Sequence, residues 1–456
     1  MTDTQQRPAA PADSGLDRFF KLTERGTSVG TEIRAGVTTF LVMAYIIAVN
    51  PGILGVAGFP SASVAAATAL IAGLLTILMG VFANVPIALA AGLGLNAAVA
   101  FTLVLGPAGL TPEGAMGVIL IEGLVVTVLV LVGLREAIMR GVPNSLKRAI
   151  GVGIGLFILF IGFVNGGLIE VGIPEKPLNF VFPNSAGAAV TLIGLALTLF
   201  LYARKVRGAL IISIVLTTVI ALIMDVASVP EGIRATPSFD TLGMFDLTNV
   251  FNQLGALTAV LTIFAFMLTD FFDTMGTATA IAEQADLIDE NGEIENLGRI
   301  LLVDSIGAAA GGAAGVSSNT SYIESSAGVA EGGRTGLTSV VTGVLFLAAI
   351  FLSPLAAIVP AEATAPVLIL VGFLMAGLLK GIDFDDLEEG FPALLALILM
   401  PLTYSITVGI GAGFVMHTLI KTFKGKAREV HPLVWIVSLA FLVFFGQAVF
   451  SDVVIG

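Results

Sequence analysis

Cysteine is absent from this chain of 456 residues, and histidine occurs only twice. Without cysteine there are no disulfides, no thiolate metal sites and no cysteine nucleophile. The two histidines, His417 and His431, lie near the end of an apolar run and in a loop. This pattern does not favour a metal centre, so the sequence predicts no metal, no cofactor, no catalytic residues and no enzymatic activity.

Charged residues are also scarce, at 12% of the chain, whereas soluble domains contain about 25%. Apolar residues other than glycine make up 56%, and the mean hydropathy is +1.01. This balance excludes a soluble fold and predicts a polytopic protein of the lipid bilayer. A formal net charge of −12 disfavours nucleic acid as a partner. Residues 1–15 are polar and rich in Pro and Ala, which predicts a disordered cytoplasmic tail rather than a cleavable signal.

Apolar runs long enough to cross a bilayer, which takes about 20 residues, fall into two sets of seven. The first set lies near 33–56, 62–83, 86–105, 114–134, 149–168, 186–203 and 208–225, and the second near 254–275, 298–315, 318–330, 336–358, 364–380, 388–402 and 403–422. A polar connection over 226–253 separates them. A further apolar stretch, 433–449, is either an additional crossing or a helix at the membrane interface.

Basic residues gather on one side of this arrangement, which predicts a cytoplasmic amino terminus. The clusters are Arg18, Lys21, Arg25 and Arg34 before span one, Arg135, Arg140, Lys147 and Arg148 after span four, Arg204, Lys205 and Arg207 after span six, and Lys421, Lys424, Lys426 and Arg428 after span fourteen. Because seven is odd, two seven-span halves are inverted relative to each other, as in many secondary transporters. We therefore expect an all-α fold of about 14 spans in a 7+7 inverted repeat, with repeats over 16–225 and 254–422 and a carboxyl-terminal segment over 423–456.

Spans three and ten look like interrupted helices. Residues 85–96 (VPIALAAGLGLN) open span three, and residues 311–320 (GGAAGVSSNT) open span ten. Unwound backbone at membrane depth is tolerated only where it lines a cavity, so matching interruptions in both halves indicate a site at the midplane. We expect a short strand-like segment followed by a half-helix in each.

Three acids lie in or beside these spans. Asp270 and Asp273 in span eight are three residues apart and share a helix face, and Glu324 lies in a polar stretch of span ten. An acid at the centre of a spanning helix costs roughly 2.5 to 3.5 kcal/mol, so such residues usually mark a transport path. The alternative is a structural acid satisfied by neighbouring hydroxyls. We favour a functional role for Asp270 and Glu324, whereas capping or interhelical bonding competes equally with proton handling at Asp273.

Four motifs together point to a family. They are Asn50-Pro51 in span one, GLGLN (92–96) in span three, TDFFDTMGT (269–277) in span eight, and YIESSAGV (322–329) followed by GGRTG (332–336) in span ten. Over about residues 16–450 the chain resembles the AzgA-like purine permeases of the nucleobase–cation symporter group, which also contains uracil and xanthine permeases. The resemblance implies a core domain of spans one to four and eight to eleven, and a gate domain of spans five to seven and twelve to fourteen. Import of adenine, guanine or hypoxanthine by proton symport, through alternating access, is the implied activity.

The resemblance also implies roles for particular residues. Asp270 and Glu324 would hold the purine, Asn96 would line the site, and Asp273 would support the substrate or the proton. Asp304 is expected to be a supporting or proton-coupling residue, with packing as the more common role for such an acid. Independently of the family, a purine edge presents N–H donors and N or O acceptors, which a carboxylate and an amide can match. Interhelical hydrogen bonding is the alternative role for Asn96.

Other functions stay open at this point. The chain is alternatively a permease for uracil or xanthine, or an anion permease or channel of the same architecture, although an anion site would not normally contain two acids. An intramembrane aspartyl protease is disfavoured because its Gly-x-Gly-Asp arrangement is missing. The expected location is the plasma membrane, and the expected partners are a purine nucleobase, the proton and lipid. A homodimer is left open.

Overall fold

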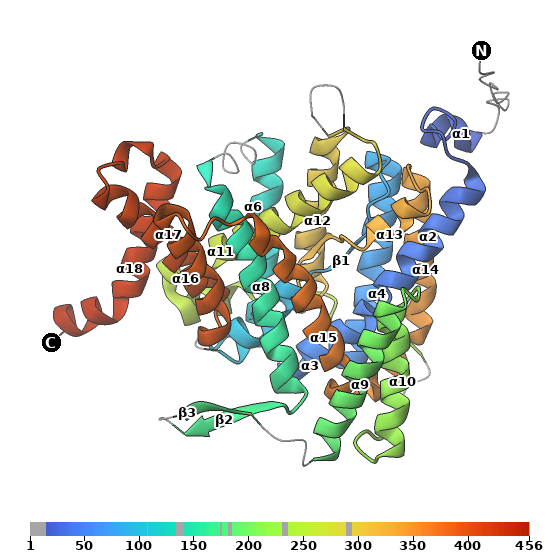
Figure 1. The fold of residues 1–456 in the computed structure, drawn as a ribbon, viewed down its shortest axis with the longest axis horizontal. Coiled ribbons are helices and arrows are strands. Elements are labelled where there is room, and N and C mark those ends of the chain that lie inside the picture. Colours follow the sequence, from blue (N-terminus) through green and yellow to red (C-terminus); the bar gives the residue numbers. More distant parts are fainter. Residues whose placement is uncertain are drawn as a thin grey trace.

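A computed structural model describes residues 15–106, 108–133, 141–173, 176–180, 185–229, 236–288 and 294–455. The tail expected over 1–15 lies outside these residues except for Gly15, as do Arg135 and Arg140 of the second basic cluster. The described chain is mostly helical (Figure 1).

The first seven predicted spans are all present. Span one is α2 (Val29–Met43) and α3 (Ile46–Val56), span two is α4 (Ser61–Leu78) and the π-helix η1 (Met79–Ala83), span three is β1 (Leu89–Ala91), α5 (Leu93–Ala97) and the π-helix η2 (Ala98–Val104), span four is α6 (Pro112–Leu131), and spans five to seven are α8 (Asn144–Asn165), α9 (Ala186–Ala203) and α10 (Ala209–Ile223). A short helix, α1 (Gly15–Phe20), precedes them, and β2 (Ile169–Ile173) and β3 (Lys176–Phe180) form an antiparallel hairpin between α8 and α9.

The second seven spans follow the same plan. They are α11 (Leu247–Gln284), α12 (Leu297–Ala313), β4 (Asn319–Ser321) with α13 (Ser325–Ala330), α14 (Gly336–Ala349) with η3 (Ile350–Ile358), α15 (Ala361–Met375) with η4 (Ala376–Gly381), α16 (Leu387–Thr403) and α17 (Ile406–Phe423). The chain continues through η5 (Ala427–Glu429) into α18 (Pro432–Ile455), which packs on α17. Within the described ranges, nine helical stretches are long and apolar enough to cross a membrane unaided.

Side chains with oxygen acceptors begin several of the spans. Thr111, Ser185, Thr335 and Ser405 precede α6, α9, α14 and α17, and each accepts a hydrogen bond from a backbone N–H of the first turn. The first N–H groups of a helix have no partner within the helix, so these caps satisfy donors that would otherwise be unpaired.

Helix packing repeats itself as a 7+7 inversion requires. The pair α4 and α14 (spans two and eleven) corresponds to the pair α12 and α6 (spans nine and four) when each span is shifted by seven. The pairs α9–α10 and α16–α17 correspond in the same way, and α8 packs on α15, its own counterpart. At the centre, β1 and β4 pair antiparallel with Ala90 opposite Thr320. The predicted inverted repeat, including strand segments in spans three and ten, is confirmed.

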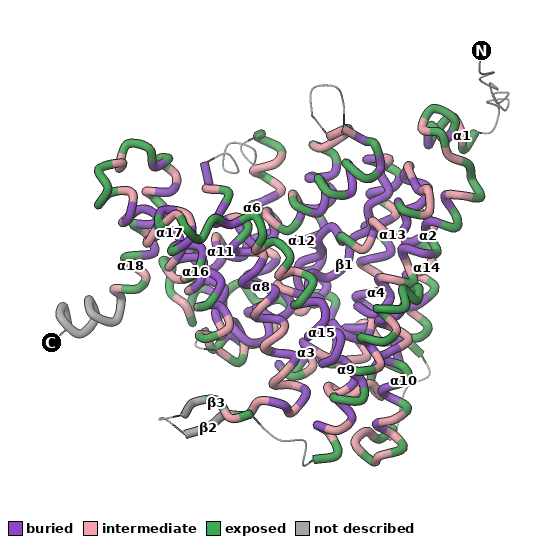
Figure 2. The backbone as a smooth tube through the Cα atoms, in the orientation of Figure 1, coloured by how far each residue is buried: buried purple, intermediate pink, exposed green. Residues whose placement is uncertain are grey.

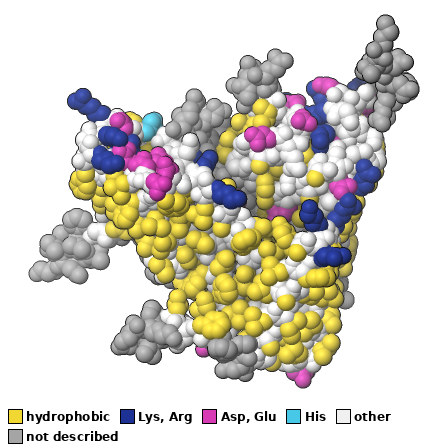
Figure 3. Space-filling model, in the orientation of Figure 1, with side chains coloured by type: hydrophobic (Ala, Val, Ile, Leu, Met, Phe, Trp, Pro, Cys, Tyr) yellow, Lys and Arg dark blue, Asp and Glu magenta, His cyan; other side chains and the backbone are white. Residues whose placement is uncertain are grey.

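The helices also separate into two groups by packing. One group contains α2 to α6 and α11 to α14, and the other contains α8 to α10 and α15 to α17. The contacts between the groups are fewer, chiefly α5 on α8, α11 on α8 and α17, α15 on α3, and α10 on α2. Figure 2 shows the buried residues concentrated along the inner sides of both groups. Hydrophobic side chains cover the middle and lower part of the visible surface in Figure 3, while charged ones gather along the upper part, from the side of α17 to that of α1.

Candidate functional site

The centre of the molecule is built around the crossing of β1 and β4. The ladder extends at both ends, because Tyr322 N–H donates to Ala88 O (2.9 Å) and Gly92 N–H donates to Ser318 O (2.8 Å). The hydroxyl of Thr76 on α4 accepts from Leu89 N–H at 2.9 Å. These bonds satisfy a backbone that leaves the helical conformation at membrane depth, where unpaired groups cost several kcal/mol. The half-helices α5 and α13 both start from this crossing.

Glu324 immediately precedes α13 and is half-buried. The hydroxyl of Tyr45 donates to its Oε1 at 2.5 Å. Tyr45 is fully buried at the junction of α2 and α3. A second tyrosine, Tyr322, donates to Ala91 O at 2.5 Å and ties the end of β4 to β1. The carboxylate is therefore fixed by span one, although span ten supplies it.

Asp270 and Asp273 share a face of α11, as expected, yet their surroundings differ. Asp270 is fully buried, and its Oδ1 accepts from the Ser318 hydroxyl at 3.2 Å, next to β4. Asp273 is exposed. It also lies well inside α11, which continues to Gln284, so the expectation of a position near the end of its span is wrong and helix capping is excluded.

A stripe of exposed small and polar residues runs from Asp273 to the carboxyl end of α11, through Gly276, Ala280 and Glu283. Asp273 and Glu283 are acidic, and acidic side chains do not suit a lipid-facing surface. We therefore interpret this stripe, called the path below, as a side of α11 that faces water. The carboxyl end of the path lies near the amino-terminal segment, because Arg25 pairs with Glu295 (2.8 Å) and Glu295 N–H donates to Leu287 O, just after α11 (2.9 Å). Toward the other face, the same stripe of α11 is buried from Asp270 back to Phe266 and Ala259.

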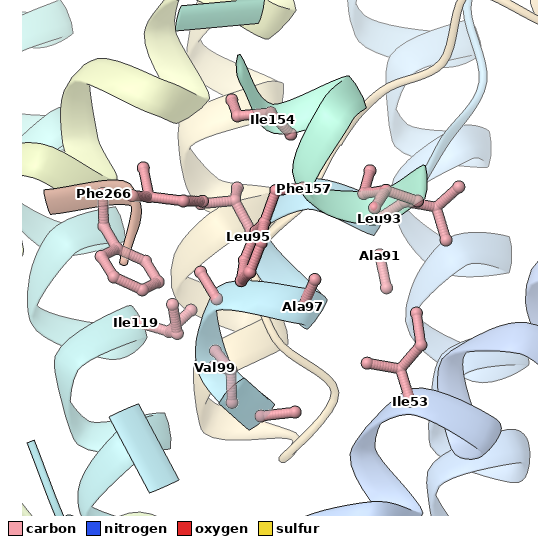
Figure 4. Packing of buried hydrophobic residues seen from close by; sticks show 14 of the residues in the cluster. Ile53, Ala91, Leu93, Leu95, Ala97, Val99, Ile119, Ile154, Phe157 and Phe266 are labelled. Carbon is pink, nitrogen blue, oxygen red and sulfur yellow. The ribbon is translucent and has the colours of Figure 1, made fainter. Parts of the chain in front are cut away.

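The two helix groups contact each other along α5 and η2. The Thr102 hydroxyl on η2 donates to the backbone oxygen of Tyr404, between α16 and α17, at 2.6 Å. The Tyr404 ring packs edge-on against Phe157 and Phe160 of α8, with ring centroids 5.9 and 5.4 Å apart. In Figure 4, Leu95 of α5 lies beside Phe157 and near Phe266, within the same apolar packing. These contacts join η2 and α5 to the second helix group.

Asp304 on α12 is a fully buried hydrogen-bond acceptor. Its Oδ1 accepts from both the backbone N–H and the hydroxyl of Ser321, each at 2.9 Å, and its Oδ2 accepts from the Thr274 hydroxyl at 2.5 Å. Thr274 in turn lies 2.9 Å from the Thr320 hydroxyl. Asp304 therefore joins α12 to α11 and β4. Of the two roles expected for it, these contacts favour the supporting role over proton coupling.

Asn96 is fully buried on α5, and neither its amide nitrogen nor its amide oxygen has a hydrogen-bond partner among the described residues. The interhelical bonds considered for Asn96 are thus missing from this part of the chain. A buried polar group without a partner costs about 1–3 kcal/mol. Asn96 consequently retains both a donor and an acceptor for a ligand or for another conformation.

Sequence reasoning missed Tyr45, Ser318 and Thr274 as contributors to the site. Ser318 and Thr274 are single hydroxyls within stretches already identified as polar, and nothing distinguished them from their neighbours. Tyr45 offered a weak signal, since it is one of only four tyrosines and lies in an otherwise apolar span.

Comparison with known proteins identifies the family. The model for xanthine/uracil permeases, described as the permease family, matches residues 30–412. The chain belongs to this permease family. It is therefore a multi-pass membrane permease and not an enzyme, as the composition predicts.

Several relatives of this permease align over three quarters or more of their length. The adenine permease AdeP of Escherichia coli (strain K12) is 42% identical over 438 residues, covering 96% of each chain. The guanine/hypoxanthine permease PbuG of Bacillus subtilis (strain 168) is 41% identical over 443 residues, covering 94% of this chain and 99% of PbuG. The nucleobase transporter PlAzg2 of Paenibacillus larvae is 34% identical over 390 residues, covering 85% of this chain and 76% of PlAzg2.

Solved structures show the same fold at low sequence identity. The transmembrane domain of the cyanobacterial bicarbonate transporter BicA has a TM-score of 0.61 at 16% identity, with 84% of this chain and 97% of BicA covered. The murine anion transporter Slc26a9, in its inward-facing state, also has a TM-score of 0.61, at 11% identity, with 92% of this chain and 74% of that chain covered.

Proposed function

We propose that this permease imports purine nucleobases, such as adenine, guanine or hypoxanthine, by proton symport. The names of relatives at 34–42% identity support a nucleobase substrate. The observation that carries the proposal is the group of carboxylates beside the crossing of β1 and β4. A carboxylate accepts the ring N–H groups of a purine, and bicarbonate or another anion would be repelled there.

Glu324 and Asp270 are the proposed purine acceptors, and Asn96 is the proposed amide partner. Glu324 is the accessible member of this set, whereas Asp270 and Asn96 are buried. Because Asn96 has no partner among the described residues, a ligand offering both a donor and an acceptor would relieve a buried unsatisfied amide. For a purine to reach these two buried side chains, α5 and α11 would have to move slightly apart.

Asp273 is the proposed proton carrier. It lies one helical turn beyond Asp270 along α11 and is exposed on the path described above. A carboxyl in this position exchanges protons with the solution while remaining next to the purine acceptors. Asp304 is proposed as a supporting residue rather than as a second proton carrier, because its oxygens are already occupied by three donors.

Transport is proposed to proceed by alternating access between the two helix groups. The group with α2 to α6 and α11 to α14 corresponds to the core of spans one to four and eight to eleven, and the other group corresponds to the gate. The core would slide against the gate and carry the crossing of β1 and β4 with it. We place the permease in the plasma membrane with a cytoplasmic amino terminus, so that the carboxyl end of the path faces the cytoplasm.

Uptake by the purified permease in proteoliposomes tests the proposal. Labelled adenine, guanine, hypoxanthine, xanthine and uracil are compared, with and without an inward proton gradient. Wild type should accumulate at least one purine, and both Glu324→Gln and Asp270→Asn should abolish or severely weaken this uptake while inserting normally. Asp385→Asn, an exposed acid between η4 and α16, serves as the control and should transport like wild type.

Two results would overturn the proposal. Near-normal uptake by both site variants at normal abundance would contradict the site, and uptake of bicarbonate or chloride without any nucleobase would favour an anion permease of the same architecture.

A further inference from the structure

Tyr45 connects two parts of the chain that lie 279 residues apart. Its hydroxyl donates to Oε1 of Glu324 at 2.5 Å, a short bond of the kind formed between a hydroxyl and a carboxylate. Its ring is fully buried, where α2 ends and α3 begins. Glu324 itself is only half-buried. The tyrosine therefore reaches the carboxylate from the protein side, and the substrate would reach it from the path.

The environment of Tyr45 fixes the position of its hydroxyl. The backbone oxygen of Tyr45 accepts from Ala48 N–H (3.0 Å) and Val49 N–H (2.9 Å), which joins the tyrosine to the first turn of α3. Asn50, on the next turn, donates to Thr68 Oγ1 (2.8 Å) and to Val316 O (3.1 Å), close to β4. Span one is thus anchored both to span two and to the segment that precedes Glu324. A hydroxyl held in this way defines where one carboxylate oxygen lies.

We infer that Tyr45 is a positioning residue for purine binding, which acts by orienting the Glu324 carboxylate. This inference rests on the proposed function. A carboxylate at the start of a short half-helix has several rotamers, and a purine N–H requires only one of them. By restricting the carboxylate before the purine arrives, Tyr45 lowers the ordering cost of binding.

The chain offers a matched control in Tyr322. This residue is also a buried tyrosine with a hydroxyl bond of 2.5 Å, and it lies two residues before Glu324. Its acceptor, however, is the backbone oxygen of Ala91 rather than a carboxylate. Tyr45→Phe and Tyr322→Phe each remove one buried hydroxyl and leave the ring in place. Only the first removes a bond to Glu324.

Kinetics of purine uptake in proteoliposomes give the first test. Initial uptake rates are measured over a range of concentrations of the purine that wild type transports best. The proteins compared are wild type, Tyr45→Phe and Tyr322→Phe. A hydrogen bond to a charged group corresponds to a factor of about 10 to 100 in affinity, so Tyr45→Phe should raise KM by about tenfold or more. Its maximal rate should stay within about twofold of wild type, since the bond orients the carboxylate for binding. Tyr322→Phe should raise KM less than Tyr45→Phe does, because its hydroxyl bonds the Ala91 backbone oxygen and not Glu324.

A double-mutant cycle gives the second test and does not depend on transport. Thermal unfolding of the purified, ligand-free permease is measured for Tyr45→Phe, Glu324→Ala and the double variant. If the tyrosine acts through Glu324, its effect should largely vanish when Glu324 is replaced. A smaller coupling is expected between Tyr322→Phe and Glu324→Ala, because the Tyr322 hydroxyl bonds Ala91 O and not Glu324.

The outcomes separate this inference from the proposed function. An unchanged KM for Tyr45→Phe in a permease that transports purines, or additive effects of Tyr45→Phe and Glu324→Ala on unfolding, would overturn the role of Tyr45. A wild-type protein that transports no purine would instead contradict the proposed function, while the unfolding cycle would still report on the contact.

Discussion

Replacing Asp304 separates a supporting role from a role in proton coupling. The carboxylate receives at least three hydrogen bonds, from the Ser321 backbone, the Ser321 hydroxyl and the Thr274 hydroxyl. Asp304→Asn keeps one oxygen for the two Ser321 donors. Its new amide group faces the Thr274 hydroxyl, which can turn and accept from it.

The expected energies follow from this inventory of donors. Asp304→Asn loses the charge and reverses one bond, which costs about 1–2 kcal/mol. Asp304→Ala leaves the buried Ser321 N–H without an acceptor and removes two hydroxyl bonds, a cost of about 3–5 kcal/mol. Thr274→Val removes the bond to Oδ2 and the bond to the Thr320 hydroxyl, and should cost about 2–3 kcal/mol because the first acceptor is a buried carboxylate. The predicted order of destabilisation is Asp304→Ala, then Thr274→Val, then Asp304→Asn.

Reversible unfolding of the purified permease in mixed micelles, titrated with a denaturing detergent, measures these differences. Purine uptake is measured in parallel at a temperature where each variant remains folded. Asp304→Asn should retain uptake, still driven by the proton gradient, because Asp304 holds β4 in place and does not exchange the proton. If Asp304→Asn unfolds like wild type and yet transports nothing, Asp304 takes part in transport directly and the supporting role is wrong.

Two further predictions concern coupling and movement. Collapsing the proton gradient with an uncoupler should stop purine accumulation in proteoliposomes, whereas undiminished accumulation driven by a sodium gradient alone would refute proton symport. A Cβ built on Gly94 of α5 lies 3.5 Å from Cβ of Ile154 on α8, so Gly94→Cys with Ile154→Cys should form a disulfide between the two helix groups. Oxidation should block transport and reductant should restore it, because the core would no longer slide against the gate. The control pair, Gly413→Cys with Ala396→Cys, lies within one group at 3.0 Å, and its oxidation should leave transport intact. Full transport by the oxidised Gly94–Ile154 pair would exclude sliding of these two groups.

The sequence by itself determined the class of the protein and the plan of its fold. Spanning helices are recognisable because each must be apolar over about 20 residues, a local property that needs no knowledge of partners. The interruptions in spans three and ten were equally readable, since glycine and polar residues at membrane depth require a protein-lined cavity. An odd number of spans in each half then fixed the inversion. The acids Asp270, Asp273 and Glu324 stood out for the same reason, because charge at that depth is costly wherever it occurs.

Only the tertiary structure decided where each acid lies and what it contacts. Asp270 and Asp273 look alike in the sequence, yet one is buried against Ser318 and the other is exposed on the path along α11. The sequence does not distinguish Asp304 from the other acids in apolar spans, whereas the structure shows hydrogen bonds from Ser321 and Thr274 to its oxygens. The bond between Tyr45 and Glu324 joins opposite halves of the inverted repeat. Such contacts depend on how distant spans cross, and a hydroxyl contributes too little to hydrophobicity or periodicity for its partner to be read from the chain.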